Sequence, residues 1–265
     1  MTLVDAATPL AHAERTLPVS GAGRYRLTLA ADAAQLRAAQ ALRFMVFNLE
    51  LQEGLAQSFE NGLDIDRFDS VCDHLLVEAI DTGQVVGTYR LQSGAMAAQG
   101  HGYYSAGEFE FAPYEGLRGE LVELGRACIH AEHRNFAVLN LLWKGIGAYA
   151  ATRGARYLIG CSSFTSQDPA VGAAAYLRLQ PHLAEPVHRT LPLPAMACPM
   201  GRRAAAAPKV PRLLSTYLAL GARICGPPAV DRSFKTIDFL TMVDLHSPAV
   251  VLALQASGRY GGTRA

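Results

Sequence analysis

Three carboxylates fall within six residues in the segment Asp64-Ile65-Asp66-Arg67-Phe68-Asp69. Like charges this close repel one another unless a cation lies between them. Arg43, on the preceding helical segment, is one candidate partner, and the ammonium group of a substrate is another. The spacing lacks the turn glycine and closing glutamate of a calcium-binding loop. The triplet is therefore interpreted either as a site for a cationic small molecule or as a solvated acidic loop.

A second charged motif, Glu123-Leu124-Gly125-Arg126, lies in an apolar run that is typical of a strand. Side chains alternate between the two faces of a strand, so Glu123 and Arg126 point to opposite faces unless a bulge intervenes. Burial raises the pKa of a carboxyl group towards the range of a general base. Glu123 is thus either a general base or one half of a buried ion pair that fixes the strand register.

The segment His133-Arg134-Asn135 precedes a helical pattern, and the free N–H groups at the start of a helix attract anions. This arrangement would suit a phosphate or a phosphopantetheine group, although no Walker A or G-x-G-x-x-G sequence is present. His130 and His133 lack a third ligand nearby, so we expect no metal site. Cys161 ends an apolar run and is interpreted as a packing residue more readily than as a nucleophile.

Strands and helices of one mixed domain must position these residues. An alternating pattern predicts a strand at 24–30, and apolar spacing predicts a helix at 34–50. Further strands are expected at 74–80, 85–91, 121–130, 156–161 and 234–245, and further helices at 139–152, 168–179 and 213–223. Residues 181–211 contain seven prolines and are expected to form an irregular insertion. We expect an arm at 1–22, a single domain at 23–250 and a tail at 251–265.

Composition excludes several classes of protein. The chain has 265 residues, of which 50% are hydrophobic and 18% charged, so it is too apolar for a disordered protein. Its apolar runs are much shorter than the roughly 18 residues of a membrane span. The five cysteines form no CxxC pair, which favours a reduced, cytoplasmic protein without structural zinc.

Charge is distributed unevenly along the chain. Residues 1–125 contain 8 Lys/Arg and 17 Asp/Glu, whereas residues 126–265 contain 16 and 6. The acidic part would receive a cationic molecule and the basic part an acidic partner or an anionic lipid surface, unless the two parts face each other. The amphipathic segment 212–223 would either touch a bilayer or pack as a core helix. A pI of 7.7 and the lack of interleaved aromatics argue against nucleic acid.

Together these motifs resemble a known group of enzymes. Arg43-x-x-Val46-Phe47, Asp64-x-Asp66-x-x-Asp69 and Glu123-x-x-Arg126 resemble the signature of acyl-homoserine-lactone synthases, with Asp64 in place of a glutamate. The tryptophan expected after the first helix of those synthases is missing. Ornithine N-acyltransferases match better, over about residues 25–245. Their resemblance adds the segments LNLLWKG at 139–145, GCSSF at 160–164, YLALGA at 217–222 and Asp231-x-x-Phe234-x-Thr236-x-Asp238-Phe239.

The resemblance implies a GNAT-like fold of class α+β, with three α/β/α layers, a central mixed, mostly antiparallel sheet and a C-terminal elaboration. It implies transfer of a 3-hydroxyacyl chain from acyl carrier protein to the α-amine of L-ornithine, which gives lyso-ornithine lipid. No separate cofactor is expected. The Q/R-x-x-G-x-G/A turn of CoA-dependent relatives is absent after Arg134, which favours the carrier protein. Alternatives are a different acceptor, such as another amino acid or S-adenosylmethionine, or a non-catalytic acyl-binding domain.

The resemblance also implies roles for individual residues. Glu123 would be the base beside Arg126, and Tyr176 would protonate the departing thiolate. Arg43 and the three aspartates Asp64, Asp66 and Asp69 would bind the acceptor. Ala127, Cys128 and Ile129 would offer backbone N–H groups to the donor. His133 and Arg134, with Arg153, Arg156, Arg202, Arg203 and Lys209, would hold its phosphate or its carrier protein. Phe109, Phe111, Leu142 and Phe164 would line an acyl tunnel or belong to the core.

Overall fold

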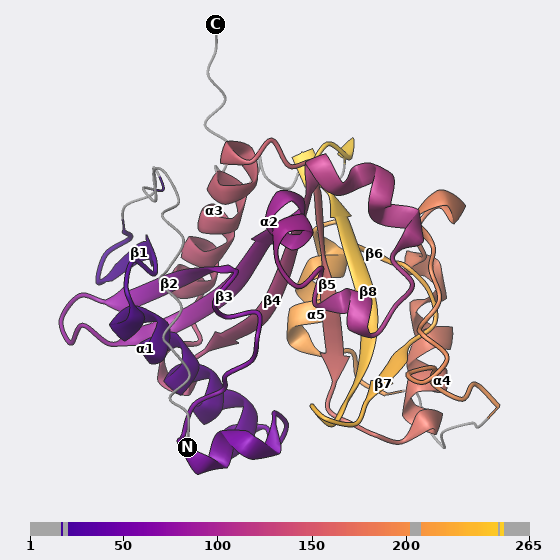
Figure 1. The fold of residues 1–265 in the computed structure, drawn as a ribbon, viewed down its shortest axis with the longest axis horizontal. Coiled ribbons are helices and arrows are strands. Elements are labelled where there is room, and N and C mark those ends of the chain that lie inside the picture. The colour runs from indigo at the N-terminus through magenta and orange to yellow at the C-terminus, as the bar shows by residue number, and fades with distance from the viewer. Residues whose placement is uncertain (1–16, 18–20, 202–207, 249, 252–265) are drawn as a thin grey trace, which may run out of the picture.

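In the computed structural model of the chain, residue 17 and residues 21–201, 208–248 and 250–251 are described. Most of the expected arm and tail lie outside the described residues, and so do Arg202 and Arg203. The rest of the chain is built around one sheet with helices on both of its faces (Figure 1).

The sheet has eight strands in the order β1-β2-β3-β4-β5-β8-β6, and β7 pairs with β8. Every pairing is antiparallel except that of β4 with β5, which is parallel. The expectation of a mixed, mostly antiparallel sheet is confirmed. The strands are β1 (Tyr25–Leu29), β2 (Asp73–Ala79), β3 (Val85–Ser93), β4 (Leu121–Ile129), β5 (Tyr157–Phe164), β6 (Arg223–Ile224), β7 (Ala229–Asp231) and β8 (Thr236–Asp244).

Five α-helices accompany the sheet within the described residues: α1 (Ala33–Phe44), α2 (Gly94–Gln99), α3 (Phe136–Thr152), α4 (Pro169–Leu179) and α5 (Arg212–Ala219). A π-helix, Met45–Glu50, extends α1 to the expected end at residue 50. Short 3-10 turns are η2 (Ala56–Glu60), η3 (Ser105–Gly107), η4 (Ala112–Glu120), η5 (Ala131–His133), η6 (Gln180–His182) and η7 (Pro186–His188). None of the helices in this part of the chain has the length and apolar character needed to cross a bilayer.

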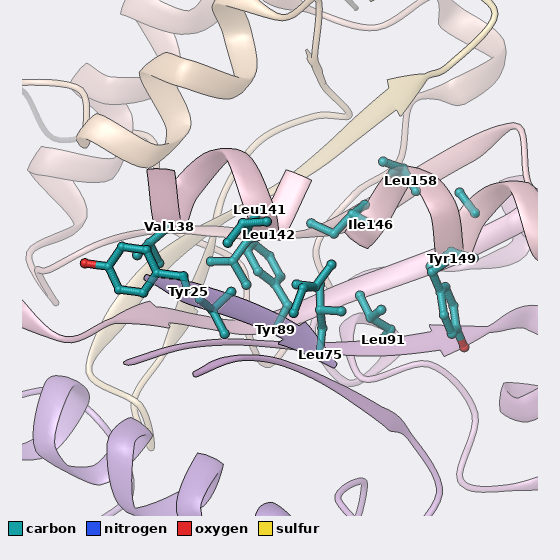
Figure 2. Packing of buried hydrophobic residues seen from close by; sticks show 14 of the residues in the cluster. Tyr25, Leu75, Tyr89, Leu91, Val138, Leu141, Leu142, Ile146, Tyr149 and Leu158 are labelled. Atoms are coloured by element: carbon teal, nitrogen blue, oxygen red, sulfur yellow. The ribbon is translucent and has the colours of Figure 1, made fainter. Parts of the chain in front are cut away.

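Alternation along β2 explains the three layers. Leu75 and Val77 pack in one cluster with α3 residues such as Leu142, whereas Leu76 packs with α1 on the other face. Figure 2 shows the α3 side of this core, with Leu142 and its helical neighbours lying over Leu75 and Leu91. Because both faces of β2 are covered, all seven of its residues are buried.

Some elements differ from the sequence-based expectation because polar side chains set their ends. Helix α3 begins at residue 136, three residues early, since the Asn135 side chain accepts a hydrogen bond from the N–H of Val138 at 3.1 Å. The strand expected at 234–245 corresponds to β8 at 236–244, and the short strand β7 before it was not predicted; the side chain of Asp231, at the end of β7, accepts hydrogen bonds from the N–H groups of Ser233 and Phe234 in the turn between them. Helix α2 was not predicted; Ser93 caps it by accepting from the N–H of Met96.

Candidate functional site

The strands β4 and β5 separate halfway along their length. Their pairing ends at Glu123↔Ile159, although β4 continues to Ile129 and β5 to Phe164. The next residue of β5 is Gly160, where a Cβ atom would lie 2.2 Å from the carbonyl oxygen of Leu124. Only glycine permits so close an approach of the two backbones at the point where their pairing ends. A cleft of about 780 Å³ opens beyond it.

A bulge in β4 turns Arg126 to the same face of the sheet as Glu123. Arg90 of β3 pairs with Gly125 and Thr88 pairs with Cys128, so two steps on β3 match three on β4. The extra residue is accommodated by Arg126, which has a φ of 49°. The sequence left open whether a bulge intervenes, and the structure shows one.

Arg126 belongs to a closed ring of alternating charges, in which each of three arginines contacts two aspartates. We call it the arginine–aspartate ring. Its contacts are Arg43–Asp64 (2.9 Å), Asp64–Arg126 (3.2 Å), Arg126–Asp66 (2.9 Å), Asp66–Arg90 (2.6 Å), Arg90–Asp69 (3.0 Å) and Asp69–Arg43 (2.6 Å). The side chains are at most 14% exposed. The ring ties the segment containing the three aspartates to α1, β3 and β4.

The ring accounts for the charge of the acidic triplet. Burial favours the neutral carboxyl, but the guanidinium groups of Arg43 and Arg90 outweigh it and hold the pKa of Asp69 below its ordinary value. Arg90 and Arg126 likewise lower the pKa of Asp66 despite its burial. Asp64, Asp66 and Asp69 are not among the cleft-lining residues. This placement argues against the acceptor-binding role that the resemblance implied for them, and Arg43 takes the pairing role instead.

Glu123 lines the cleft and holds a neighbouring loop. Its two carboxylate oxygens accept hydrogen bonds from the backbone N–H groups of Tyr104 at 2.7 Å and Ser105 at 2.8 Å. Burial raises the pKa of Glu123, while these hydrogen bonds oppose the rise. Among the described residues Glu123 has no ion pair with Arg126, so the structure does not support the alternative of a simple register-fixing pair.

A second group of acids lines the cleft on the same face. Glu108, Asp231 and Asp238 each place a carboxylate oxygen within 4.8 Å of those of the other two, and all three residues are buried. We call them the carboxylate cluster. Asp238 lies opposite Ser163 in the β5–β8 register, and Asp231 ends β7. Glu108 directly follows η3.

The carboxylate cluster is electrostatically strained. Burial raises the pKa of Glu108 well above its ordinary value, the nearby Asp238 and Asp231 raise it further, and Arg126 opposes the rise. Burial also raises the pKa of Asp238, against hydrogen bonds from Ser163 and Thr236. Oε2 of Glu108 and Oδ1 of Asp238 have no hydrogen-bond partner within the described part of the protein.

Sequence reasoning missed the cluster as a site because its members come from three distant segments. The available signal was the motif Asp231-x-x-Phe234-x-Thr236-x-Asp238, which the resemblance singled out without assigning it a role. Glu108 carried no comparable signal, since only the loop held by Glu123 brings it to the cleft.

The opposite face of the cleft is apolar. Leu124 and Leu158 point to the α3 side, because they alternate with Glu123 and Ile159. Residues of α3 and α5 complete this wall: Leu139, Leu142, Trp143, Leu214 and Tyr217. Of the four side chains considered for an acyl tunnel, Leu142 lines the cleft, whereas Phe109, Phe111 and Phe164 pack in core clusters.

The remaining candidate donor residues divide into two groups. Ala127, Cys128, Ile129 and Arg134 line the cleft. Arg134 is also paired with Glu50, with 2.6 Å between its Nη2 and Oε2 of the glutamate. His133 and Tyr176 do not line it. The Nδ1 of His133 lies 3.1 Å from the hydroxyl of Tyr25.

Two further residues have a plain structural explanation. Tyr176 stacks on Phe239 with 6.5 Å between ring centroids, in the core cluster beside α4 and α5. Cys161 lies near Ser105, with 3.4 Å from Sγ to Oγ, and burial raises its pKa well above the ordinary value. A neutral thiol is a poor nucleophile, which favours the packing interpretation of Cys161.

Near α3, Glu132 approaches His130 and His133 as a third potential metal ligand that the sequence spacing did not reveal.

Comparison with known proteins agrees with this architecture. Residues 42–144 match the acetyltransferase (GNAT) domain family. The chain is 35% identical over 247 residues to the L-ornithine N(alpha)-acyltransferase of Agrobacterium fabrum, covering 86% of this chain and 83% of that protein. It is 35% identical over 254 residues to the enzyme of the same name from Rhizobium meliloti, covering 88% and 81%. The crystal structure of the AHL synthase LasI shares the fold, with a TM-score of 0.52, 14% identity and coverage of 91% and 97%.

Proposed function

Because the chain belongs to the L-ornithine N(alpha)-acyltransferase family, we propose that it transfers an acyl chain from a thioester to the α-amine of L-ornithine. One observation carries the proposal: the cleft between β4 and β5 is apolar along one face and acidic along the other. The apolar wall suits a fatty chain, and the acidic wall suits an amino acid with a second ammonium group. The two substrates would meet where the strands separate.

The chemistry requires a proton acceptor, since an ammonium group has no lone pair to attack with. We assign this role to Glu123, which lines the cleft and whose pKa is raised by burial. The α-ammonium gives one proton to Glu123, directly or through water. The amine then attacks the thioester carbonyl carbon, the new C–N bond forms and the C–S bond breaks. The second amine proton ends on the departing sulfur.

Backbone groups of β4 supply the remaining stabilisation. Beyond Glu123 this strand has no pairing with β5, so the N–H groups on its β5-facing edge near Ala127, Cys128 and Ile129 face the cleft. Such donors stabilise the negative oxygen of the tetrahedral intermediate, and in other enzymes one donor contributes about 2.7–4 kcal/mol. Their position supports the donor-binding role expected for this stretch.

For the donor we propose a 3-hydroxyacyl chain on acyl carrier protein. The connection from β4 to α3 is the short turn η5, with Asn135 as the cap, and it lacks the glycines that would cradle a pyrophosphate. Arg134 and Arg212 lie at the cleft on the α3 and α5 sides, where an acidic carrier protein would approach. Association would then weaken as salt is added.

The test compares donors and acceptors in one experiment. The purified protein is incubated with the same 3-hydroxyacyl chain on acyl carrier protein or on CoA, together with a panel of amino acids and S-adenosylmethionine. Mass spectrometry identifies the product. We expect N-acylornithine, formed faster from the carrier protein. Product only with S-adenosylmethionine would refute the acceptor, equal rates from CoA would refute the donor, and no product with any amine would indicate a non-catalytic acyl-binding domain.

A further inference from the structure

We propose that the carboxylate cluster of Glu108, Asp231 and Asp238 binds the side-chain ammonium of the acceptor and so selects a diamino acid over an uncharged one. The inference rests on the proposed function and adds the part of the site that recognises the acceptor. It moves acceptor recognition away from the acidic triplet that the sequence indicated.

Within the described residues, the carboxylate cluster lacks a paired cation. The three members of the cluster are between 3% and 7% exposed, and no ion pair to any of them occurs among the described residues. Buried carboxylates without a counter-ion are strongly disfavoured. The cluster therefore has to take up a proton or a ligand cation, and its position on the cleft makes a ligand cation accessible to it.

Some carboxylate oxygens of the cluster are open to accept hydrogen bonds from a ligand. Oδ1 of Asp231 is occupied by the N–H groups of Ser233 and Phe234, and Oδ2 of Asp238 by the hydroxyl of Thr236. In contrast, Oε2 of Glu108 and Oδ1 of Asp238 are buried and have no hydrogen-bond partner among the residues that the structure describes. An alkylammonium group carries three N–H donors, which matches one oxygen from each of three carboxylates.

One short loop connects the cluster to Glu123, the proposed base at the reacting end of the acceptor. Glu123 holds the N–H groups of Tyr104 and Ser105, and the N–H of Glu108 donates to the carbonyl oxygen of Ser105 at 3.1 Å. Glu108 is thus fixed relative to the proposed base by one short loop. This arrangement would hold the two amines of one acceptor at a constant separation.

A monocation suits the cluster better than a divalent metal ion. The guanidinium of Arg126 is near enough to oppose the rise in the pKa of Glu108, so positive charge is already present beside the cluster. Two of the carboxylate oxygens that a metal ion would need are occupied by hydrogen bonds from Ser233, Phe234 and Thr236. The cluster also lines a cleft of about 780 Å³, which is the size of a site for an organic substrate.

The experiment uses norvaline, which has the carbon skeleton of ornithine without the side-chain amine. For the wild-type protein, kcat/KM should be at least about 100-fold higher for ornithine than for norvaline, because a buried charged contact is lost. Glu108→Gln and Asp238→Asn should each lower kcat/KM for ornithine by about 10- to 100-fold, mainly through KM. Their kcat/KM for norvaline should stay within about threefold. The matched control Glu110→Gln changes an exposed glutamate outside the cleft and should leave both substrates unaffected.

Calorimetry without donor gives a second measurement, in which the wild-type protein should bind ornithine and not norvaline. This comparison needs no variant and holds even if a variant fails to fold. Equal use of ornithine and norvaline, or equal loss of both in Glu108→Gln, would overturn the inference while leaving ornithine acylation intact. Failure of the wild type to acylate ornithine would instead refute the proposed function. Saturable Mg²⁺ or Ca²⁺ binding that Asp238→Asn abolishes would assign the cluster to a metal.

Discussion

The arginine–aspartate ring and the carboxylate cluster are both buried groups of three acids, and they differ in what surrounds them. In the ring every aspartate contacts two guanidinium groups, whereas the cluster makes no ion pair within the described chain. The pKa values of Asp66 and Asp69 are accordingly lowered, and those of Glu108 and Asp238 are raised. Carboxylates that are paired with arginines stabilise the fold, whereas carboxylates without an ion pair at a cleft are suited to binding a cationic ligand.

The largest effect should come from breaking the ring. Arg43→Met removes a buried guanidinium and leaves Asp64 and Asp69 partly uncompensated, so the free energy of unfolding should fall by about 3–5 kcal/mol. Urea denaturation measures the change. The matched control is Arg24→Met, which breaks the pair with Asp81, whose side chains are 59% and 54% exposed, and should change stability by at most about 1 kcal/mol. Similar losses in both variants would contradict a structural role for the ring.

Only part of the arginine–aspartate ring could be predicted from the sequence. The proximity of Asp64, Asp66 and Asp69 indicated either a cation among them or a solvated acidic loop, and Arg43 was correctly named as a candidate partner. Arg90 and Arg126 were not predicted as partners. Strand register brings Arg90 there, and only the bulge in β4 turns Arg126 to that face. The arginines that complete the ring are brought together by the pairing of strands β3 and β4. No local pattern in a single sequence reveals that pairing.

The strands and helices themselves were largely predictable, because hydrophobic periodicity reports which face of an element is buried. The strand at 121–130 and the helix at 168–179 agree with β4 and α4 to within one residue. Short capped elements such as α2 were missed, since six residues are too few to show a period. The carboxylate cluster was not predicted as a site for a different reason, because Glu108 does not belong to any recognisable sequence motif.

Glu123 interacts with both groups, because the charge of Arg90 in the ring opposes the rise in its pKa and its carboxylate holds the loop that carries Glu108. Glu123→Gln should lower kcat by about 100-fold, the lower end of the range for a lost general base. It should also destabilise the fold by about 1–3 kcal/mol, because the backbone N–H groups of Tyr104 and Ser105 donate to different carboxylate oxygens and the NH2 group that replaces one of them cannot accept.

The pH profile separates the two contributions of Glu123. If Glu123 is the base, kcat/KM of the wild type rises as its carboxyl loses a proton, and the glutamine variant lacks that rise. If Glu123 only positions the loop, the variant is slower and keeps the same pH profile. The second result would assign proton transfer to another group.

The contributions of the ring and of the carboxylate cluster to the free energy of unfolding should also depend on pH in opposite directions. A carboxyl with a raised pKa binds more protons folded than unfolded, so its contribution declines as pH rises towards its folded pKa. Glu108→Gln should therefore become more stable than the wild type as pH increases from about 5 to 8. Asp69, with a lowered pKa, contributes stability at neutral pH that is lost in acid, so Asp69→Asn should cost least at low pH.

The groups that face Glu108 bear on this measurement. They are Asp231 on β7, Asp238 on β8, Arg126 on β4, Cys161 on β5, Tyr104 just before η3 and, through Asp238, Glu53. Asp238→Asn should reproduce the direction seen for Glu108→Gln, since either change removes the repulsion between the same two carboxyls. Chemical denaturation at a series of pH values, with Glu110→Gln as the exposed control, measures both slopes. Parallel slopes for the cluster and ring variants would contradict the distinction between the groups.

The smallest effect should come from Tyr176, which the resemblance implied as the acid for the departing thiolate. Its ring stacks on Phe239 in the core, and it is not among the residues lining the cleft. Tyr176→Phe keeps the stacked ring and removes only the hydroxyl, so kcat should stay within about twofold of the wild type, far from the 10²–10⁴-fold range of a lost acid. A fall of that size with the fold intact would show that α4 moves towards the cleft during turnover. An unchanged kcat would leave the second amine proton, or water, as the source of the thiol hydrogen.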